Sequence, residues 1–336
     1  MRVMSLSNTV GIDNLSIQER PVPQPGRQEI LVKVKAAALN YRDLEIVRGD
    51  YHTAFQLPLI PLSDAVGDVV AVGQDVTRFQ AGDRVCSTFW QRWVGGSFRM
   101  AERNYQRGGP IDGLLAEYAV LDEQAAVLAP INLTDIEAAT LPCAAVTAWH
   151  ALVTEGGIRA GDTVLVLGTG GVSLFGLQFA RASGARVIVT SSSDEKLTRV
   201  RELGAYAGIN YRRTPEWSKA VRDLTEGRGV DHIIEVGGPA SFAQSLEAAG
   251  IRGQINIIGY LGGSDGTANP LDIFRKQVDV RGIPVGSRES FESMIRAIEV
   301  NDIKPVIDRV FDWTAAPDAL RYLEAGSHFG KIVLQL

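Results

Sequence analysis

The sequence predicts an α/β protein in which a doubly wound parallel sheet is inserted into a split, mostly β domain. Three observations predict this fold class: the chain has 336 residues, strand patterns dominate before about residue 130, and strand-length apolar segments alternate with helical segments after it. A chain of this length suits two packed domains better than one. Alternating strands and helices favour a parallel sheet that helices cover on both faces.

The mostly β domain is expected to comprise residues 1–130 and 287–336. Segment 29–37 (EILVKVKAA) alternates apolar and charged residues, which is typical of a half-buried strand. Gly and Asp turn signals separate two further strand candidates, 65–72 and 82–86. The C-terminal part contributes two helical segments and a closing strand, at 291–300, 316–324 and 331–336.

The inserted domain is expected to comprise residues 131–286. Its strand candidates are short and apolar, and they cover 164–167, 187–190, 208–211, 232–236, 254–258 and 278–283. The segments between them carry apolar residues at helical spacing, at 170–183, 194–203, 217–224 and 241–249. This alternation predicts the parallel sheet.

A glycine-rich turn follows the first of these strands, in the segment VLVLGTGGVS. Gly168 permits a tight turn, and Gly170 has no side chain to keep a pyrophosphate away from the backbone. Gly171 and Val172 begin a helix that offers free N–H groups and the positive end of its dipole. Ser173 occupies the third position of the fingerprint, where a small side chain still allows close packing. The turn therefore predicts a bound dinucleotide.

The second strand of the inserted domain ends without the acidic residue that usually holds the ribose 2′-OH of NAD. Ser191 occupies that position, so a 2′-phosphate would meet no carboxylate there. Ser192, Lys196 in the next helix and Tyr211 after the next strand are further candidate contacts. We therefore expect NADP rather than NAD as the cofactor. A capping box of Ser192 and Glu195 would also explain the serines, and the two interpretations are compatible.

Composition argues against several functional classes. The net charge is −5 and no long basic stripe is present, so nucleic acid is not an expected partner. No apolar run approaches the roughly 20 residues that span a bilayer, and the N-terminus lacks the features of a signal peptide, so we expect a cytoplasmic protein without membrane contact. The two cysteines and four histidines form no Cys-x-x-Cys or His-x-x-x-His pair, so no metal site is expected.

Six motifs together resemble the medium-chain dehydrogenase/reductase superfamily over essentially the whole chain. They are AALNYRD (37–43), PLIPLSDAVGDVVAVG (58–73), GDRV (82–85), LPCAAVTAWHAL (141–152), GTGGVS (168–173) and GKIVL (330–334). The resemblance implies a GroES-like catalytic domain, a Rossmann domain and a cleft for a small-molecule substrate. It also implies a homodimer joined through an edge strand of the Rossmann sheet, expected here around residues 254–260. Further cofactor contacts are expected at Gly237, Gly259, Val285 and Ser287.

The superfamily that the chain resembles has zinc-dependent and zinc-free members. Zinc-dependent members carry Cys where this chain has Asn40 and His-Glu where it has Ser63 and Asp64, whereas the third ligand position matches Cys143. One thiolate cannot hold a catalytic zinc ion, because that site needs three protein ligands and an open position. The chain therefore resembles the zinc-free members.

The motifs NYRD and SDAVG resemble the quinone oxidoreductase branch, in which Asn40 and Tyr51 would point at the nicotinamide and Thr147 would lie beside it. The other active-site Tyr of that branch falls at Glu45, which departs from the quinone-specific pattern. The implied reaction is NADPH-dependent hydride transfer to a small conjugated carbonyl or quinone, with Asn40 and Tyr51 stabilising the oxyanion.

Two other functions stay open, an NAD(P)-dependent alcohol dehydrogenase and a non-catalytic nucleotide-binding protein. Single residues also have structural alternatives, since Asn40 could bond the backbone of a turn and Tyr51 could be a loop aromatic. The segment 87–115 is either a surface loop over the cleft or a solvated insertion. Cys143 and His150 are expected to be structural, and a cofactor or substrate contact is left open for Arg288 and Lys331.

Overall fold

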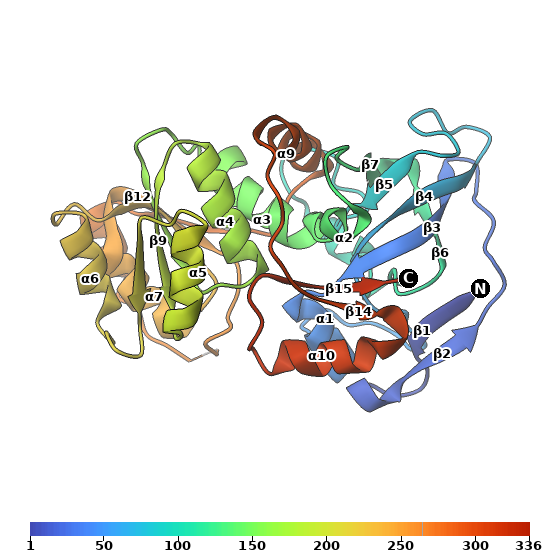
Figure 1. Cartoon of the computed structure of the whole chain (residues 1–336), viewed down its shortest axis with the longest axis horizontal. Coiled ribbons are helices and arrows are strands. Elements are labelled where there is room, and N and C mark those ends of the chain that lie inside the picture. The colour runs from blue at the N-terminus through green and yellow to red at the C-terminus, as the bar shows by residue number, and fades with distance from the viewer. Residues whose placement is uncertain (264) are drawn as a thin grey trace. The chain divides into compact units, whose positions relative to one another are not determined.

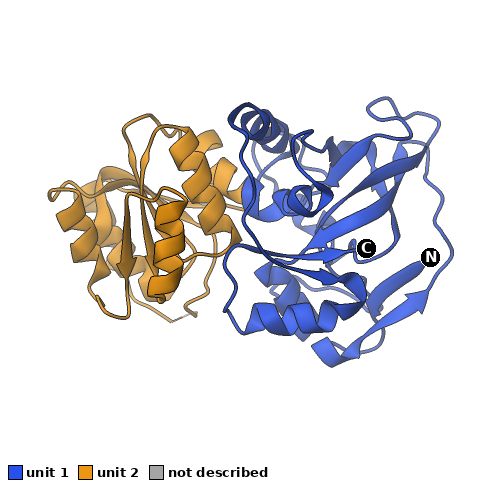
Figure 2. Cartoon of the chain, in the orientation of Figure 1, with its two compact units in different colours: residues 1–146, 286–336 blue, residues 147–285 orange. Residues whose placement is uncertain are grey.

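The computed structural model describes residues 1–263 and 265–336. The chain divides into two compact units (Figure 2). Unit 1 comprises Met1–Val146 and Gly286–Leu336, and unit 2 comprises Thr147–Val285. The predicted fold class is confirmed, because unit 2 contains a parallel sheet and the strands of unit 1 form a split, mostly β unit.

Six strands of the described chain form the parallel sheet of unit 2, in the order β10-β9-β8-β11-β12-β13 (Figure 1). The strands are β8 (Thr163–Leu167), β9 (Arg186–Ser191), β10 (Ala207–Asn210), β11 (Val230–Glu235), β12 (Ala249–Ile257) and β13 (Asp279–Gly282). The helices are α4 (Gly171–Ala182), α5 (Asp194–Glu202), α6 (Trp217–Leu224), α7 (Pro239–Ala248) and α8 (Pro270–Lys276), with the π-helical turn η5 (His150–Thr154) before them. The direction of winding reverses between β8 and β11, which is where sheets of this kind bind ligands.

Helices cover both faces of this sheet. On one face α4 packs so closely that a Cβ added to Gly176 would lie 3.4 Å from Ile234 of β11. On the other face Trp217 of α6 and Leu246 of α7 join a core that includes Ile233 of the same strand. Successive side chains of a strand point to opposite faces, so β11 is buried on both sides, as its apolar sequence predicts.

The edge of the unit 2 sheet differs from the expected one. We expected the exposed edge strand around residues 254–260, but β12 pairs with β11 on one side and with β13 on the other. The edge strand is β13, because it adds to the sheet beyond β12. Any association through a sheet edge on this side would therefore use β13.

Unit 1 contains two sheets within the described residues. One joins β1 and β2, and the larger sheet follows the order β14-β15-β3-β4-β5-β7, with β6 also paired to β3. The strands are β1 (Arg2–Leu6), β2 (Leu15–Glu19), β3 (Glu29–Ala38), β4 (Asp64–Val72), β5 (Arg84–Ser87), β6 (Tyr118–Asp122), β7 (Ala126–Leu128), β14 (Ile307–Asp312) and β15 (Lys331–Gln335). The helices are α1 (Tyr41–Arg48), α2 (Asp135–Ala138), α9 (Arg288–Asn301) and α10 (Ala316–Glu324), and α3 (Val146–Trp149) crosses into unit 2. Short helical turns are η1 (Ile12–Asn14), η2 (Met100–Tyr105), η3 (Glu123–Ala125), η4 (Leu141–Ala145) and η6 (Trp313–Ala315).

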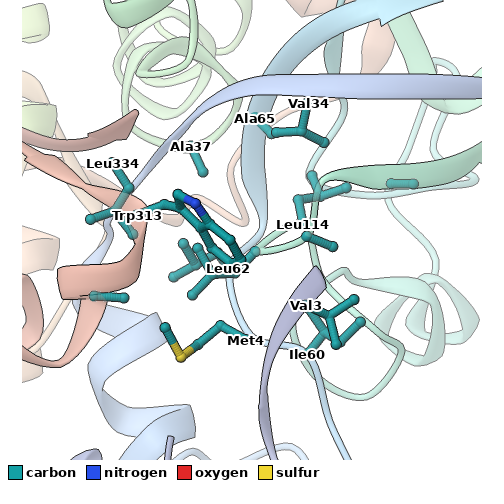
Figure 3. Packing of buried hydrophobic residues seen from close by; sticks show 14 of the residues in the cluster. Val3, Met4, Val34, Ala37, Ile60, Leu62, Ala65, Leu114, Trp313 and Leu334 are labelled. Atoms are coloured by element: carbon teal, nitrogen blue, oxygen red, sulfur yellow. The ribbon is translucent and has the colours of Figure 1, made fainter. Parts of the chain in front are cut away.

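The core of unit 1 joins the two ends of the chain. Trp313 packs among aliphatic side chains that include Met4, Leu62 and Leu334 (Figure 3). Burying one side chain of this size stabilises the fold by about 1.5–3 kcal/mol. This packing holds the C-terminal strand β15 against β3, although about 300 residues separate them.

Residues 131–146 belong to unit 1, whereas we expected them in the nucleotide-binding part. The reason is packing, since α2 contacts β3, β4 and β15, and η4 contacts β4 and β5. The short helix α2 begins with a capping box, in which Thr134 accepts from the backbone N of Glu137. The compact units therefore divide at Val146 rather than at residue 130.

The 87–115 insertion is more than a solvated loop. Phe89, Trp90 and Trp93 are buried, and the ring of Phe98 lies 4.8 Å from Trp90 and 5.0 Å from Trp93. The insertion is thus folded against unit 1 by its own aromatic side chains.

Helix α1 was not predicted from the sequence. Asn40 is its N-cap residue, and Gly49 ends it with a φ of 83°, a conformation that suits glycine. In front of the helix, β3 pairs antiparallel with β15, with Ala38 opposite Val333. Continuing that register by two residues sets Asn40 opposite Lys331.

No helix in the described part of the chain is both long and apolar enough to cross a membrane.

Candidate functional site

Lys331 and Asn40 form the centre of a buried polar cluster in unit 1, which consists of Asn40, Asp43, Asp64, Cys143 and Lys331. Lys331 is 3% exposed, and its Nζ donates to the backbone oxygen of Leu39 and to Oδ1 of Asn40, both at 2.6 Å. An ammonium can only donate, so Oδ1 rather than Nδ2 of Asn40 must face Lys331. Nδ2 is left buried without a hydrogen-bond partner among the described residues.

Asp64 is the fully buried carboxyl group of this cluster. Its Oδ1 accepts from Oγ of Ser63 at 2.7 Å, and its Oδ2 accepts from the backbone N of Cys143 at 3.0 Å. Burial raises the pKa of Asp64, while the charge of Lys331, these hydrogen bonds and the Asn40 amide oppose that rise. The Asn40 amide therefore lies near enough to favour the ionised carboxylate, although Nδ2 does not reach hydrogen-bond geometry.

Asp43 is a second fully buried carboxyl group. Its Oδ2 accepts from the backbone N of Asn40 at 2.8 Å, and its Oδ1 accepts from Nη1 of Arg42 at 3.1 Å. Burial raises the pKa of Asp43 to about 6, against the opposing charge of Arg42 and with the help of Asp64. The charge of the cluster thus changes at mildly acidic pH.

The side chains of this cluster do not fit a catalytic zinc ion. Burial and the charge of Asp64 raise the pKa of the Cys143 thiol, although part of this residue is exposed, and zinc binds the thiolate. The ammonium of Lys331 is bonded to Oδ1 of Asn40, so a cation there would meet a positive charge. Across residues 1–263 and 265–336, no group of three or more His, Cys, Asp or Glu could hold a metal ion.

Arg42 connects this cluster to Tyr51. Its guanidinium lies 5.0 Å from the ring centroid of Tyr51 and 5.1 Å from that of Phe89, and it donates to two backbone oxygens of the 87–115 insertion, both at 3.0 Å. The Tyr51 hydroxyl donates to Oε1 of Gln106 at 3.2 Å. Burial raises the pKa of Tyr51, with Arg42 opposing, so its hydroxyl stays protonated and able to donate.

Two of the three predicted catalytic residues lie in unit 1 and are connected there. The backbone of Asn40 bonds Asp43, Asp43 bonds Arg42, and Arg42 stacks on Tyr51. Thr147 is buried on α3, at the start of unit 2. Contact of these residues with a substrate stays a prediction.

Sequence reasoning missed part of this arrangement. It gave Arg42 no role, and it left the role of Lys331 open. Neither AALNYRD nor GKIVL indicates the strand register that brings Lys331 to Asn40. The side-chain oxygen of Asn40 bonds Lys331, and Asn40 is also the N-cap residue of the capping box that it forms with Asp43 at the start of α1.

The glycine-rich turn of unit 2 has the backbone that the sequence predicts. Gly168 has a φ of 76°, and Gly170 is the N-cap residue of α4. A Cβ added to Gly170 would meet nothing within 4 Å, so the space in front of the helix is open. Ser173 fits the third position because its Oγ donates to the backbone oxygen of Leu167 at 2.7 Å. Free N–H groups in the first turn of α4 make this end suitable for a pyrophosphate.

The helix after β9 begins at Asp194 as expected, but its N-cap residue lies one position later than expected. We expected a capping box of Ser192 and Glu195, but the N-cap residue is Ser193, whose Oγ accepts from the backbone N of Lys196 at 3.3 Å. Ser191 is buried, and its Oγ accepts from the backbone N of Ser193. Ser192 is partly exposed at the end of the strand and is not needed as a cap.

The acid nearest to these serines is paired. Asp194 accepts from Nδ2 of Asn210 at 2.8 Å and forms an ion pair with Arg213 at 2.5 Å. Tyr211 and Arg212 are exposed directly after β10, whose last residue pairs with Ser191. The carboxyl ends of β9 and β10 thus bring hydroxyl groups near the exposed guanidinium of Arg212, which suits a phosphate.

Gly237 and Gly259 both contact Glu235, the buried acidic residue at the end of β11. Glu235 is fully buried, and its Oε1 accepts from the backbone N of Gly237 at 2.8 Å and of Gly238 at 3.0 Å. Its other oxygen accepts from Oγ of Ser245. These bonds shape the loop after β11, and the backbone N of Gly259 lies 3.4 Å from the backbone oxygen of Glu235.

Val285 and Ser287 lie at the return to unit 1. Val285 has a φ of 67°, which is uncommon for a β-branched residue. Ser287 caps α9, where its Oγ accepts from the backbone N of Ser290 at 3.1 Å. Arg288 donates to the side chain of Gln124 within unit 1. Ser287 therefore has a structural role, and its contact with a cofactor stays a prediction.

Two family models match the chain. The one described as "Alcohol dehydrogenase GroES-like domain" covers residues 26–131, and the one described as "Zinc-binding dehydrogenase" covers residues 171–300. A zinc-type alcohol dehydrogenase-like protein of Schizosaccharomyces pombe is 45% identical over 336 residues, which cover 97% of this chain and 96% of its own length. A quinone oxidoreductase of Lama guanicoe is 29% identical over 345 residues, which cover 100% of this chain and 98% of its own.

Solved structures also match over the full length. An NAD-dependent alcohol dehydrogenase has a TM-score of 0.91 at 35% identity and covers 100% of both chains. A protein from Sinorhizobium meliloti 1021 that is classed with the alcohol dehydrogenases has a TM-score of 0.93 at 44% identity, covering 100% of this chain and 99% of its own. A mycobacterial protein solved with NADPH has a TM-score of 0.83 at 27% identity and covers 100% of both chains.

Proposed function

The chain belongs to the medium-chain dehydrogenase/reductase superfamily, as its motifs predicted, and on that premise we propose that it is an NADPH-dependent reductase of conjugated carbonyl or quinone substrates that works without zinc. One observation carries the proposal: in the buried polar cluster, the ammonium of Lys331 is bonded to Asn40, the residue at a zinc-ligand position, whose Nδ2 has no hydrogen-bond partner among the described residues.

The proposed chemistry uses hydrogen-bond donors in place of a Lewis acid. The cofactor would supply a hydride to one end of a conjugated system, and negative charge would then develop on the distant oxygen. Among the described residues, Nδ2 of Asn40 is a buried amide donor without a hydrogen-bond partner, although the Asp64 carboxylate lies near it, and we propose that it bonds that oxygen when the substrate is bound. A donor placed where charge develops stabilises the transition state more than the ground state.

Tyr51 is proposed as a second donor rather than as the proton source. Its raised pKa keeps the hydroxyl protonated, and its bond to Gln106 is long enough to exchange for a stronger acceptor. Arg42 holds the ring in position by stacking. A proton from water then completes the product, because a hydroxyl with a raised pKa is a poor acid at neutral pH.

We propose NADPH as the preferred cofactor. Ser191 at the end of β9, and the exposed Arg212 after β10, support a 2′-phosphate. Among the matching structures one contains NADPH, whereas another is an NAD-dependent enzyme, so both cofactors belong in the test. The glycine-rich turn would hold the pyrophosphate of either.

An alcohol dehydrogenase is the second candidate, and the names of the relatives favour it. That reaction needs a group to take the hydroxyl proton as well as a partner for the oxygen. In the buried polar cluster, Asp43 has a pKa of about 6, but both of its oxygens already accept hydrogen bonds from Asn40 and Arg42.

The experiment is a turnover assay with NADPH and NADH over panels of enones, quinones and primary alcohols, on protein treated with a chelator. We expect NADPH oxidation with an enone or quinone and no gain on addition of zinc. Elemental analysis of the untreated protein accompanies the assay. Alcohol oxidation that is lost on chelation and restored by zinc would support the second candidate instead.

We also propose a homodimer that joins along β13. This strand is the outer strand of the unit 2 sheet, and Leu271 and Phe274 of the neighbouring α8 are exposed. An unpaired strand edge beside apolar side chains is a surface that proteins usually cover. Light scattering after size exclusion should give twice the chain mass, and Phe274→Glu should reduce it to one.

A further inference from the structure

We propose that Lys331 is a positioning residue for catalysis, whose ammonium fixes the side-chain amide of Asn40 so that the donor Nδ2 is presented to the reacting oxygen of the substrate. The inference rests on the proposed function, in which Asn40 stabilises a developing oxyanion. It adds a residue from the last strand of the chain to that function.

Strand pairing brings the two residues together. In the antiparallel pair of β3 and β15, Ala38 lies opposite Val333, so Asn40 and Lys331 lie opposite each other just beyond the paired residues. The backbone oxygen of Leu39 accepts from Nζ of Lys331 at 2.6 Å and anchors the ammonium. The position of Nζ is therefore set by the sheet rather than by Asn40.

The bond from Lys331 and the nearby carboxylate of Asp64 both favour the same orientation of the Asn40 amide, with Oδ1 toward Nζ of Lys331. An asparagine amide can rotate by half a turn and exchange its oxygen and nitrogen with almost no change of shape. Here the flipped amide would bring a donor to 2.6 Å from a group that only donates. A hydrogen bond from a charged donor stabilises the observed amide orientation more than a bond from a neutral donor would.

The orientation matters because the two ends of the amide act oppositely on a substrate oxygen. Nδ2 donates to a developing oxyanion, whereas a flipped Oδ1 would repel it. Asn40 is only 9% exposed, so water offers little compensation for a wrong orientation. Lys331 therefore acts through Asn40, and its own contacts are with protein groups.

The first test measures the amide directly in cofactor-free protein. The side-chain NH₂ resonances of Asn40 are assigned by their loss in Asn40→Leu and are then compared in Lys331→Met. We expect these resonances to shift and to exchange faster in Lys331→Met, because the carbonyl oxygen has lost its charged donor. The control is Lys35→Met, which removes a lysine of β3 that pairs with Asp68 at 2.7 Å and should leave the resonances unchanged.

The second test is kinetic and uses the enone or quinone on which the wild-type protein turns over. Losing one oxyanion donor lowers kcat by about 10²–10³-fold, so Asn40→Leu should lie in that range. We expect Lys331→Met to lower kcat about tenfold, with little change in KM for NADPH, because only part of the population is then misoriented. In the Asn40→Leu background, Lys331→Met should cause no further loss, since its effect passes through Asn40.

Two results would overturn the proposal: unchanged Asn40 resonances in Lys331→Met, or an equal loss of kcat with and without Asn40. If Lys331→Met does not fold, Lys331→Gln replaces it, with the same expected shift of the resonances and the same two overturning results. A wild-type protein that turns over none of the enones and quinones would end the proposed function instead, and the resonance test would still decide whether Lys331 orients the amide.

Discussion

The two units bury carboxylates in different ways. Among the described residues, the carboxylate of Glu235 in unit 2 accepts from neutral donors alone, two backbone N–H groups and two serine hydroxyls, and all of them lie within 10 residues along the chain. Asp43 and Asp64 in unit 1 instead lie near two positive charges, that of Arg42, which is the residue next to Asp43, and that of Lys331, which comes from the last strand of the chain. The site in unit 2 is therefore formed by a local turn, whereas the site in unit 1 also needs the register of β3 and β15.

This difference separates what each site can do. A carboxylate held by backbone N–H groups is fixed in place and shapes a loop, as Glu235 does after β11. A cluster of side-chain charges can be redistributed when one partner changes, so it can tune the orientation and charge of neighbouring donors. We therefore expect substitutions in unit 2 to act on stability or cofactor binding, and substitutions in the buried polar cluster to act on charge and turnover.

The largest effect is expected for Glu235→Ala. The substitution leaves two backbone N–H groups, of Gly237 and Gly238, without their acceptor inside the protein. Each unpaired buried group costs about 1–3 kcal/mol, so we expect a loss of about 3 kcal/mol or more in the free energy of unfolding. Urea unfolding followed by circular dichroism measures this loss.

The control for that prediction is Glu202→Ala on helix α5 of the same unit. Glu202 is exposed at the end of that helix, so its removal should change the free energy of unfolding by no more than about 0.5 kcal/mol. Equal effects of the two substitutions would mean that the neutral donors around Glu235 do not depend on it.

Gly170→Asp is expected to separate cofactor binding from stability. Asp is a preferred N-cap residue and a Cβ at Gly170 meets nothing within 4 Å, so the fold should tolerate it. A carboxylate about 5 Å from a pyrophosphate costs about 2–3 kcal/mol at a partly screened site, so NADPH and NADH should both bind about 100-fold more weakly. Fluorescence titration measures the two affinities.

Gly170→Ser is the control, because it adds a neutral capping side chain at the same place. It should keep cofactor affinity within a few-fold of the wild type. Undiminished NADPH binding in Gly170→Asp would show that the pyrophosphate does not lie at this helix end.

The contrast between the units also explains which features of the structure could be predicted from the sequence. The glycine-rich turn was predictable because its conformation is a local property: Gly168 needs a positive φ, and Gly170 needs an open approach. The parallel sheet was predictable from its alternating pattern for the same reason. Local patterns failed where pairing with another segment decides the outcome, so the outer strand proved to be β13 rather than β12.

The buried polar cluster was the harder part. Asn40 and Cys143 could be singled out because they occupy positions that carry zinc ligands in relatives, which is a comparison of residue types. Nothing near Lys331 in the sequence indicates that its Nζ reaches Leu39 and Asn40, because that contact needs the register of β3 and β15. The capping residue Ser193 was missed by one position, since three consecutive serines offer equivalent caps.

Ser191→Asp is expected to have a smaller effect that depends on the cofactor. A carboxylate at the end of β9 would repel a 2′-phosphate and accept from a ribose 2′-OH. We expect NADPH to bind about tenfold more weakly and NADH to bind no more weakly than to the wild type. Comparing the two titrations makes NADH the internal control. A parallel loss for both cofactors would mean that Ser191 does not contact the part in which they differ.

The smallest effect is expected from Asp43, and it appears as a dependence on pH. The pKa of Asp43 is raised from 3.8 to about 6 in the folded chain, chiefly by burial, with Asp64 adding to the rise and Arg42 opposing it. A carboxyl group with a raised pKa favours folding while it is protonated. Its contribution is complete below the unfolded value of 3.8 and is lost as the pH rises through 6. The wild-type protein should therefore lose about 1 kcal/mol of stability between pH 5 and 6 relative to Asp43→Asn, which has no proton to lose.

Urea unfolding at intervals of half a pH unit, followed by tryptophan fluorescence, measures this difference. Asp302→Asn is the control, because Asp302 is exposed and its pKa is lowered, so its contribution is already complete in this range. If the difference between wild type and Asp43→Asn is flat from pH 5 to 6, then the carboxylate of Asp43 is held ionised by Arg42, and the cluster in unit 1 is as fixed in charge as the turn around Glu235.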